Sequence, residues 1–182
     1  MSVKALDLSA AGPKITVRRA RTGDADKFLS LVNELATYEK LSPPGRKEIR
    51  RLRRDAFGKN RKFELVMGFA GSRAVAYAVY FMTYSTFLAK PTLYLEDIFV
   101  LPEFRRAGVG TAIFSILGET AARRRCGRME WSVLKWNEMA LNFYGKIGAK
   151  ELSEWTYFRM TEDNFGRLIC AGKTGRRALT QG

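Results

Sequence analysis

The sequence predicts a mixed α/β fold in which helices cover a central sheet. The expected elements follow the order strand, helix, helix, three strands, helix, strand, helix, strand. Three strands in succession disfavour a doubly wound parallel sheet, in which strands and helices alternate throughout. With 182 residues and 46% hydrophobic content, the chain can bury one core, and we expect a single domain over residues 14–163.

The first half of the chain predicts one strand and two helices after a flexible tail over residues 1–13. Residues Ile15–Arg18 read as a short strand, and Thr22 or Asp24 can cap the helix that follows. A Pro-Pro-Gly break at 43–45 separates this helix from a second, very basic one. The apolar residues of the two helices recur at helical spacing: Phe28, Leu31, Val32, Leu35 and Ala36, then Ile49, Leu52 and Ala56.

The second half predicts a β-hairpin followed by alternating helices and strands. Gly71 and Ser72 are the hairpin signal, Asn137 can cap the last helix, and Gly148 ends it. Residues 164–182 are expected to form a basic, flexible tail. The expected strands are Phe63–Ala70, Ala74–Tyr84, Leu93–Val100, Met129–Leu134 and Trp155–Met160, and the expected helices are Gly108 to about Arg125 and Glu138–Ile147.

Histidine is absent from the sequence, which excludes several classes of active site. Serine–histidine and cysteine–histidine nucleophile pairs need it, and so do most zinc sites. Cys126 and Cys170 are too few for a disulfide framework and are not spaced for a metal, so we expect no metal. Proton transfer must therefore use Glu, Asp, Tyr, Lys or Cys.

The sequence carries no signal for a membrane or for secretion. No apolar run approaches the ~18 residues that are needed to cross a bilayer. The N-terminus also lacks the charged head, apolar middle and small-residue exit of a secretory signal. We therefore expect a cytoplasmic protein without a membrane partner.

The chain has a formal net charge of +14, which creates a positive field that concentrates anions. The excess charge gathers in three clusters, which are either solvated surfaces or binding surfaces. Nucleic acid is therefore an alternative partner. The clusters are Arg46, Lys47, Arg50, Arg51, Arg53, Arg54, Lys59, Arg61 and Lys62; Arg123, Arg124, Arg125 and Arg128; and Lys173, Arg176 and Arg177.

The stretch from Leu93 to Gly110 has the layout of a site for a phosphate-bearing acyl donor. An apolar strand with two adjacent acids runs into a basic, glycine-spaced turn that opens a helix. Gly108 and Gly110 let backbone N–H groups approach a pyrophosphate at the positive end of the helix dipole. Arg105 and Arg106 add two planar donors suited to phosphate oxygens.

Two blocks of sequence carry a resemblance to a known family. The first is Y-L-E-D-I-F-V-L-P-E-F-R-R-A-G-V-G over residues 94–110, and the second is W-N-E-M-A-L-N-F-Y-G-K-I-G-A from Trp136 to Ala149. They resemble the Y-L-E-D strand, the R-x-x-G-x-G acetyl-CoA loop and the W-N-x-x-A/S-x-x-F-Y-x-x-x-G-A helix of the spermidine/spermine (diamine) N-acetyltransferases, a family of the GNAT superfamily. A weaker match is E-L-A-T-Y-E from Glu34 to Glu39. The resemblance spans about Ile15 to Met160.

The resemblance implies a GNAT fold with acetyl-CoA (coenzyme A) as the cofactor. That fold has a mixed, mostly antiparallel sheet of about six to seven strands, about four helices and a splayed strand pair that holds the cofactor. Ile98, Phe99 and Val100 would offer backbone groups to the pantetheine arm, and Asn137 and Tyr144 would contact the cofactor elsewhere. The pyrophosphate would be held by Arg105, Arg106, Ala107, Gly108, Val109, Gly110 and Thr111.

The resemblance also implies two catalytic residues. Glu96 would help to deprotonate the amine, and Tyr144 would protonate the departing thiolate. The chemistry demands both steps independently, because an alkyl amine with a pKa near ~10.4 is mostly protonated at pH 7 and cannot attack a thioester. Direct attack through a tetrahedral intermediate needs no enzyme nucleophile, so a chain without histidine can perform it.

The substrate is less closely specified than the reaction. Residues 85–87 read Ser-Thr-Phe where the family tends to show Asp-Pro-Trp, and the basic second helix should repel a polyamine. A polyamine, a diamine, a lysine analogue and an aminated antibiotic all fit the same chemistry. The implied substrate-binding residues are Tyr38, Glu39, Glu96, Asp97 and Trp155.

We therefore predict an acetyl-CoA-dependent N-acetyltransferase that acts on a primary amine of a small molecule. One alternative is a GNAT-fold module that binds nucleic acid or an acidic partner through residues 46–62. Another is a protein or peptide N-acetyltransferase. The resemblance further implies a homodimer.

Overall fold

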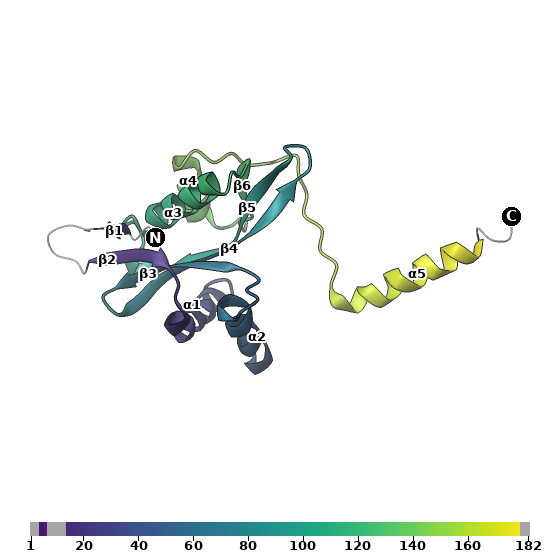
Figure 1. The fold of residues 1–182 in the computed structure, drawn as a ribbon, viewed down its shortest axis with the longest axis horizontal. Coiled ribbons are helices and arrows are strands. Elements are labelled where there is room, and N and C mark those ends of the chain that lie inside the picture. Colours follow the sequence, from purple (N-terminus) through teal and green to yellow (C-terminus); the bar gives the residue numbers. More distant parts are fainter. Residues whose placement is uncertain (1–3, 7–13, 179–182) are drawn as a thin grey trace. The chain divides into compact units, whose positions relative to one another are not determined.

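The computed structural model describes residues 4–6 and 14–178, with side chains over residues 14–172. Its six strands form one sheet in the order β1-β2-β3-β4-β5-β6 (Figure 1). Neighbours from β1 to β5 are antiparallel, whereas β5 and β6 are parallel. The strands are β1 (Lys4–Leu6), β2 (Ile15–Arg19), β3 (Glu64–Ala70), β4 (Arg73–Ser85), β5 (Lys90–Val100) and β6 (Arg128–Trp131). The predicted mixed, mostly antiparallel sheet is confirmed, at the lower end of the predicted strand number.

The helices in the described part of the chain confirm the four predicted ones and add a fifth. The α-helices are α1 (Ala25–Tyr38), α2 (Arg46–Phe57), α3 (Val109–Arg123), α4 (Glu138–Lys146) and α5 (Phe165–Ala178), with short 3-10 turns at Thr22–Asp24, Pro102–Phe104 and Glu162–Asn164. Phe28 of α1 and Ile113 and Leu117 of α3 are buried in the core, as their spacing predicts. Gly71, with φ at 59°, makes the predicted turn between β3 and β4.

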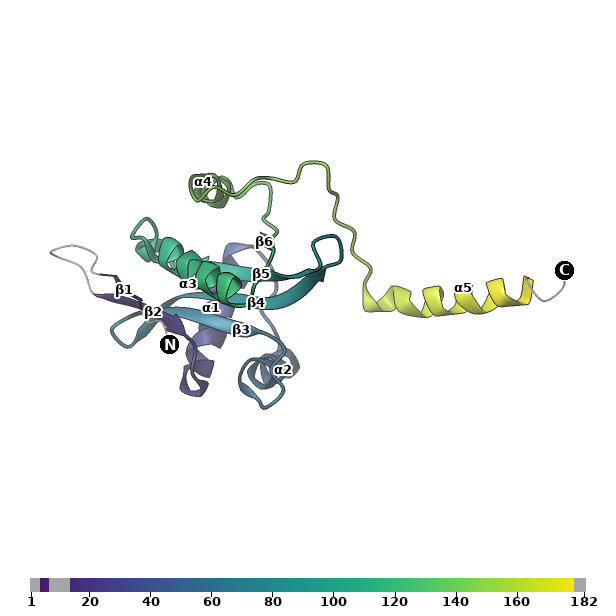
Figure 2. The same ribbon diagram turned by 45° about the horizontal axis from the view of Figure 1, so that its top comes forward.

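Helices cover both faces of the sheet (Figures 1 and 2). On one face, Phe28 of α1 packs edge-on against Tyr77 of β4, with ring centroids 5.3 Å apart. On the other face, the start of α3 lies close to β3: a Cβ on Gly68 would stand 3.2 Å from the Ala76 Cβ and 3.4 Å from the Val109 Cγ1. Because neighbouring residues of a strand point to opposite faces, Tyr77 faces α1 and Ala76 faces α3.

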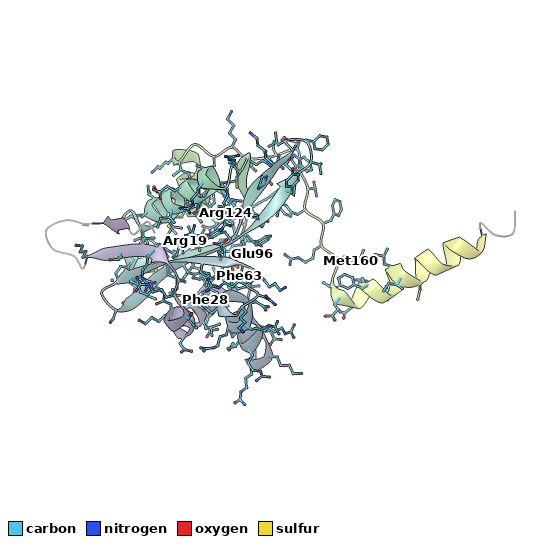
Figure 3. The ribbon with its side chains drawn as sticks, viewed as in Figure 1. Arg19, Phe28, Phe63, Glu96, Arg124 and Met160 are labelled. Carbon is cyan, nitrogen blue, oxygen red and sulfur yellow. The ribbon has the colours of Figure 1, made fainter. Side chains whose placement is uncertain are left out.

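An ion-pair network anchors the face of the sheet that α3 covers. Glu64 of β3 accepts from Arg19 at 3.2 Å and from the hydroxyl of Tyr80 at 3.1 Å, and it pairs with Arg124 at 2.6 Å. Arg19 also donates to Thr120 of α3 at 3.0 Å. Figure 3 shows Arg19 and Arg124 on the α3 side of the sheet and Phe28 and Phe63 toward α1 and α2.

One predicted strand is wrong. Residues Trp155–Met160 form no strand, and Trp155 and Phe158 are exposed by 72% and 93%. A strand exists only if a neighbouring backbone bonds it, and among the described residues none pairs with this segment. The apolar pattern of the segment could not reveal the lack of a partner.

Two elements were not expected. Lys4–Leu6, in the predicted N-terminal tail, forms β1 and pairs with β2, whereas the rest of residues 1–13 lies outside the described residues. Phe165–Ala178, in the predicted C-terminal tail, forms α5 although Gly166 and Gly172 lower its helix propensity. Residues 179–182 lie outside the described part, and no helix in that part is long and apolar enough to cross a membrane.

Internal contacts divide the chain into two compact units, Met1–Glu138 and Met139–Gly182. The first unit contains the sheet and α1, α2 and α3, together with most of the predicted site residues. The second contains nearly all of α4, with Tyr144, and the segment that carries Trp155. The single domain over residues 14–163 stays a prediction.

Candidate active site

A β-bulge sets the position of the two predicted acids. On the ladder between β4 and β5, Tyr80 is opposite Leu95 but Val79 is opposite Asp97, so Glu96 is an extra residue without a partner. A bulge re-aims the side chains on either side of it. Tyr80 bonds to Glu64 on the α3 face, so Leu95 faces α3, whereas Asp97 and Phe99 follow Val79 and Tyr77 onto the α1 face. Without the bulge, Leu95, Asp97 and Phe99 would share one face.

Beyond the bulge, the edge of β5 that faces β6 is open. β6 pairs with β5 only from Thr92 to Leu95, and the part of the chain that the structure describes places no strand beside the remainder of β5. The N–H of Leu101 donates to Val75 O at 2.9 Å, so the alternation of an antiparallel ladder turns the N–H and C=O of Phe99 toward β4 as well. The backbone groups of Ile98 and Val100 therefore point toward the open edge. This is the splayed pair that the fold prediction contains.

The turn before α3 has the backbone of an anion site. Arg106 and Gly108 both have positive φ, at 61° and 77°, and Gly108 is the N-cap of α3 in the left-handed conformation. No side chain caps this helix start, so its first N–H groups remain available to a ligand. Left-handed residues near a helix start make concave arrays of N–H groups that bind phosphates. With the open edge of β5, the turn fits an acyl donor that carries both a pantetheine arm and a pyrophosphate.

The two predicted phosphate-binding arginines are placed differently. Arg106 is exposed beside the turn. The Nε of Arg105 instead donates to Val100 O at 2.9 Å, and its guanidinium lies 4.6 Å from the ring centroid of Tyr38 and 5.7 Å from that of Phe99. In this arrangement Arg105 links the open strand edge to the α1 face, which leaves the backbone of the turn as the candidate anion site.

Aromatic side chains line the α1 face next to Asp97. Tyr38, at the end of α1, lies 6.1 Å from Phe99 and 5.8 Å from Trp136, measured between ring centroids. Phe99 in turn lies 6.5 Å from Tyr77. Trp136 is 56% exposed, so this wall reaches solvent at one end. Ring faces beside carboxylates attract organic cations, because both present negative charge to the ligand.

Negative charge gathers around Asp97. Burial, followed by the charges of Glu96 and Glu39, raises the pKa of Asp97 to about 6. Burial also raises the pKa of Glu39. Glu96 itself is exposed at the bulge, where a proton can pass to water (Figure 3). The structure thus brings Tyr38, Glu39, Glu96 and Asp97 together at the end of α1 and the middle of β5.

The remaining predicted residues belong to α4, to the residue directly before it and to the segment after it. Asn137 directly precedes α4, and its N–H donates to Leu134 O at 2.8 Å. In the second unit, Tyr144 is buried in α4, and burial raises its pKa to about 12, so the phenol is neutral at pH 7. Trp155, also in the second unit, is 72% exposed in an irregular segment.

Sequence reasoning missed two residues of the aromatic face, Tyr77 and Trp136. Trp136 is the first residue of the second sequence block, and a search for an aromatic partner of Tyr38 could have pointed to it. Tyr77 lies in a run of apolar strand residues, and nothing in that run distinguishes its hydroxyl. Its placement depends on the register between β4 and β5, which no sequence pattern specifies here.

Two further features of the described residues bear on the chemistry. Within the described residues, no three His, Cys, Asp or Glu side chains gather as a metal site would require. On α2, Arg51, Arg53 and Arg54 pair with acids, but the exposed cations Arg46, Lys47 and Arg50 have no acidic partner in the described part of the chain. One side of α2 is therefore a surface of uncompensated positive charge.

Comparison with known proteins decides the family. Residues 28–149 match the sequence profile of the Acetyltransferase (GNAT) family, a span that includes the bulge, the open edge, the turn before α3 and Tyr144. The chain belongs to this family. It is an acetyltransferase, as predicted, and family members take the acetyl group from acetyl-CoA.

Relatives confirm the resemblance to small-amine acetyltransferases. The chain is 35% identical over 170 residues to a thialysine N-epsilon-acetyltransferase of Sus scrofa, covering 87% of this chain and 98% of the relative. It is 31% identical over 157 residues to a spermidine/spermine N(1)-acetyltransferase-like protein 1 of Homo sapiens, covering 81% of this chain and 22% of that protein. Among solved structures, an integron cassette protein from V. cholerae superposes with a TM-score of 0.74 at 20% identity, over 85% of this chain and 97% of the other, which supports the GNAT fold.

Proposed function

We propose that this acetyltransferase transfers the acetyl group of acetyl-CoA to the terminal primary amine of a small alkyl compound with a single side-chain ammonium, of the lysine-analogue type. The observation that carries the proposal is the group of three carboxylates, Glu39, Glu96 and Asp97, beside an aromatic wall and the open edge of β5. An ammonium group fits this site by charge and by cation–π attraction. The thioester supplies the electrophilic acyl carbon.

Each residue in the proposal has a separate task. Asp97 and Glu39 hold the ammonium group, and ionised Asp97 is favoured once that positive charge is present. Glu96, exposed at the bulge, removes a proton from the amine directly or through water. Free backbone N–H groups at the β5 edge stabilise the oxyanion. Tyr144, a neutral phenol, gives its proton to the leaving thiolate, a role that rests on the match of α4 to the family helix.

Charge favours a lysine analogue over a polyamine. The net charge of +14 and the uncompensated side of α2 repel a ligand with several positive charges. A lysine analogue also has an α-ammonium group, but its carboxylate offsets that charge. It can therefore approach the positively charged protein at little electrostatic cost. The thialysine acetyltransferase of Sus scrofa, of which this chain covers 98%, supports the same choice.

The test is release of CoA thiol from acetyl-CoA with a panel of amines at two ionic strengths. The panel contains thialysine, ornithine, putrescine, spermidine, an aminoglycoside and a lysine peptide. We expect the highest kcat/KM with thialysine or ornithine and little effect of salt on it. For spermidine, raising the salt from ~50 to ~300 mM should increase kcat/KM, because screening weakens the repulsion. A preference for spermidine at low salt would contradict the proposed amine class, and no turnover with any amine would contradict the proposed function.

A second function is favoured by the basic surface of α2, where Arg46, Lys47 and Arg50 lack acidic partners among the described residues. We propose it as a site for nucleic acid, whose phosphates would neutralise these charges. Replacing the three by Gln should weaken binding of a short RNA or DNA duplex and reduce the slope of log K against log salt by about 3 × 0.9 for duplex DNA. No binding by the wild-type chain at low salt would refute this function and leave the enzyme proposal intact.

We also propose the homodimer that the family resemblance implies. Light scattering after size-exclusion chromatography should then give twice the chain's 20.6 kDa. A monomer mass at micromolar concentration would contradict the proposal.

A further inference from the structure

Tyr77 has a buried hydroxyl that the proposed mechanism does not use. The residue has no exposed surface, and its ring packs against Phe28 at 5.3 Å and Phe99 at 6.5 Å between centroids. Within the described residues, the hydroxyl oxygen has no hydrogen-bond partner. A phenylalanine would make the same ring contacts without burying a polar atom.

This hydroxyl is a cost to the free protein. An unsatisfied buried hydroxyl loses its bonds to water and gains none in return. Tyr80, three residues along the same strand and equally buried, shows the ordinary solution, since its hydroxyl donates to Glu64 at 3.1 Å. The bare hydroxyl of Tyr77 therefore suggests an acceptor that becomes available in another state of the protein.

The register identifies that acceptor. Tyr77 lies directly opposite Phe99, and Asp97 is two residues away from Phe99 on the same face, diagonal to Tyr77. Diagonal neighbours of an antiparallel pair are within reach of long and aromatic side chains. The charges of Asp97 and Glu39 both act on the Tyr77 phenol and, together with burial, raise its pKa well above its ordinary value, so it remains a donor at every pH of interest.

We propose that Tyr77 is a positioning residue for Asp97, and that its hydroxyl donates to the Asp97 carboxylate when an ammonium group occupies the site. The inference rests on the proposed function, because it needs an amine bound beside Asp97. In the free protein the Tyr77 hydroxyl has no hydrogen-bond partner among the described residues, and burial together with the charges of Glu96 and Glu39 makes the Asp97 carboxylate unfavourable. A bound ammonium favours the carboxylate, and the phenol then completes its hydrogen bonding and directs it toward the amine.

The charged and titratable groups around Asp97 determine how the protonation of its carboxyl depends on pH. Glu96 from its own strand and Glu39 at the end of α1 act on Asp97 by charge, and Tyr77 of β4 is its diagonal neighbour. Tyr38 and Arg105 lie on the same face beside Phe99. Only Tyr77 among them is a buried, neutral donor without a partner. Removing its hydroxyl should therefore raise the pKa of Asp97 in the amine complex, because a hydrogen bond to the charged form is lost.

The test compares Tyr77→Phe with the matched control Tyr80→Phe. For each we would measure kcat and KM for the best amine of the panel, KM for acetyl-CoA, the pH profile of kcat and the melting temperature. For Tyr77→Phe we expect a rise in amine KM of about tenfold or more, as for a lost hydrogen bond to a charged group. The acid limb of the kcat profile should move to higher pH, while acetyl-CoA KM is unchanged and the melting temperature is equal or higher. Tyr80→Phe should melt earlier with an unchanged amine KM.

The outcomes separate this inference from the proposed function. If the wild type turns over an amine and Tyr77→Phe retains its amine KM and pH profile, the hydroxyl has no role at Asp97 and the inference is wrong. If the wild type binds acetyl-CoA but turns over no amine of the panel, the proposed function fails and the inference fails with it. A lower melting temperature with an unchanged amine KM in Tyr77→Phe would show a purely structural hydroxyl and would also overturn the inference.

Discussion

Replacing Asp97 by Asn should stabilise the protein while it weakens amine binding. The pKa of this carboxyl rises from the ordinary 3.8 to about 6, mainly through burial and further through Glu96 and Glu39. Ionising Asp97 is therefore harder in the folded protein than in the unfolded chain. Asparagine has nearly the same shape and no charge, so it removes this cost.

The size and the pH dependence of the effect follow from linkage. At 1.36 kcal/mol per tenfold change in proton affinity, ionised Asp97 costs at most about 3 kcal/mol at pH 8, where it is charged in both states. At pH 5 it is mostly protonated in the folded protein and mostly ionised in the unfolded chain, and the cost is about 1.5 kcal/mol. Because the folded pKa is the higher one, the cost grows as pH rises from about 4 to about 6 and is constant above that range.

The assay is urea unfolding of wild type, Asp97→Asn and the control Glu34→Gln at pH 5 and pH 8. Glu34 is exposed on α1 and loses the same charge, so it controls for the net charge of the protein. We expect Asp97→Asn to gain about 1.5 kcal/mol more stability at pH 8 than at pH 5, and its amine KM to rise by tenfold or more. An equal gain at the two pH values, or a loss at pH 8, would refute the assignment of a raised pKa to Asp97.

Three other variants test separate parts of the molecule. Tyr144→Phe should lower kcat by ~10²-fold or more while calorimetry still detects acetyl-CoA binding, and unchanged turnover would exclude it as the general acid. Gly108→Val should weaken acetyl-CoA binding by tenfold or more, since a β-branched residue does not tolerate φ at 77°; Gly118→Ala, which adds a Cβ in open space on α3, should bind normally. Glu64→Gln should lower the free energy of unfolding by ~1–3 kcal/mol without changing either KM, and a changed amine KM would connect the α3 face to the site.

The sequence predicted much of this fold because its strongest local signals agree with the tertiary structure. The helical spacing of Phe28, Ile113 and Leu117 indicates which helix faces pack against the sheet, and Gly71 indicates the hairpin turn. The glycine-spaced turn before α3 could be recognised because few residue types other than glycine adopt a positive φ without strain. These features depend on residues close in sequence.

The features that escaped prediction depend on partners distant in sequence. Lys4–Leu6 is a strand because β2 offers it an edge, and Trp155–Met160 is not one because no neighbour pairs with it among the described residues. The bulge at Glu96 left no trace in the apolar pattern, since helices cover both faces of the sheet and either phase of alternation is acceptable. Motifs identified the site residues, but only the register between β4 and β5 shows which of them lie on the same face of the sheet.

The bulge at Glu96 has a consequence for how this enzyme can change over evolutionary time. The bulge exists because β5 has one residue more than β4 at this point, so an insertion or deletion there acts differently from a substitution. Deleting one residue between Leu95 and Ile98 would restore regular alternation and leave Leu95 and Phe99 on their present faces, but only one of the two acids Glu96 and Asp97 would remain. A family built on this strand can vary its acceptor by exchanging side chains around Asp97, whereas shortening β5 by one residue at the bulge would remove one of the two acids from the site.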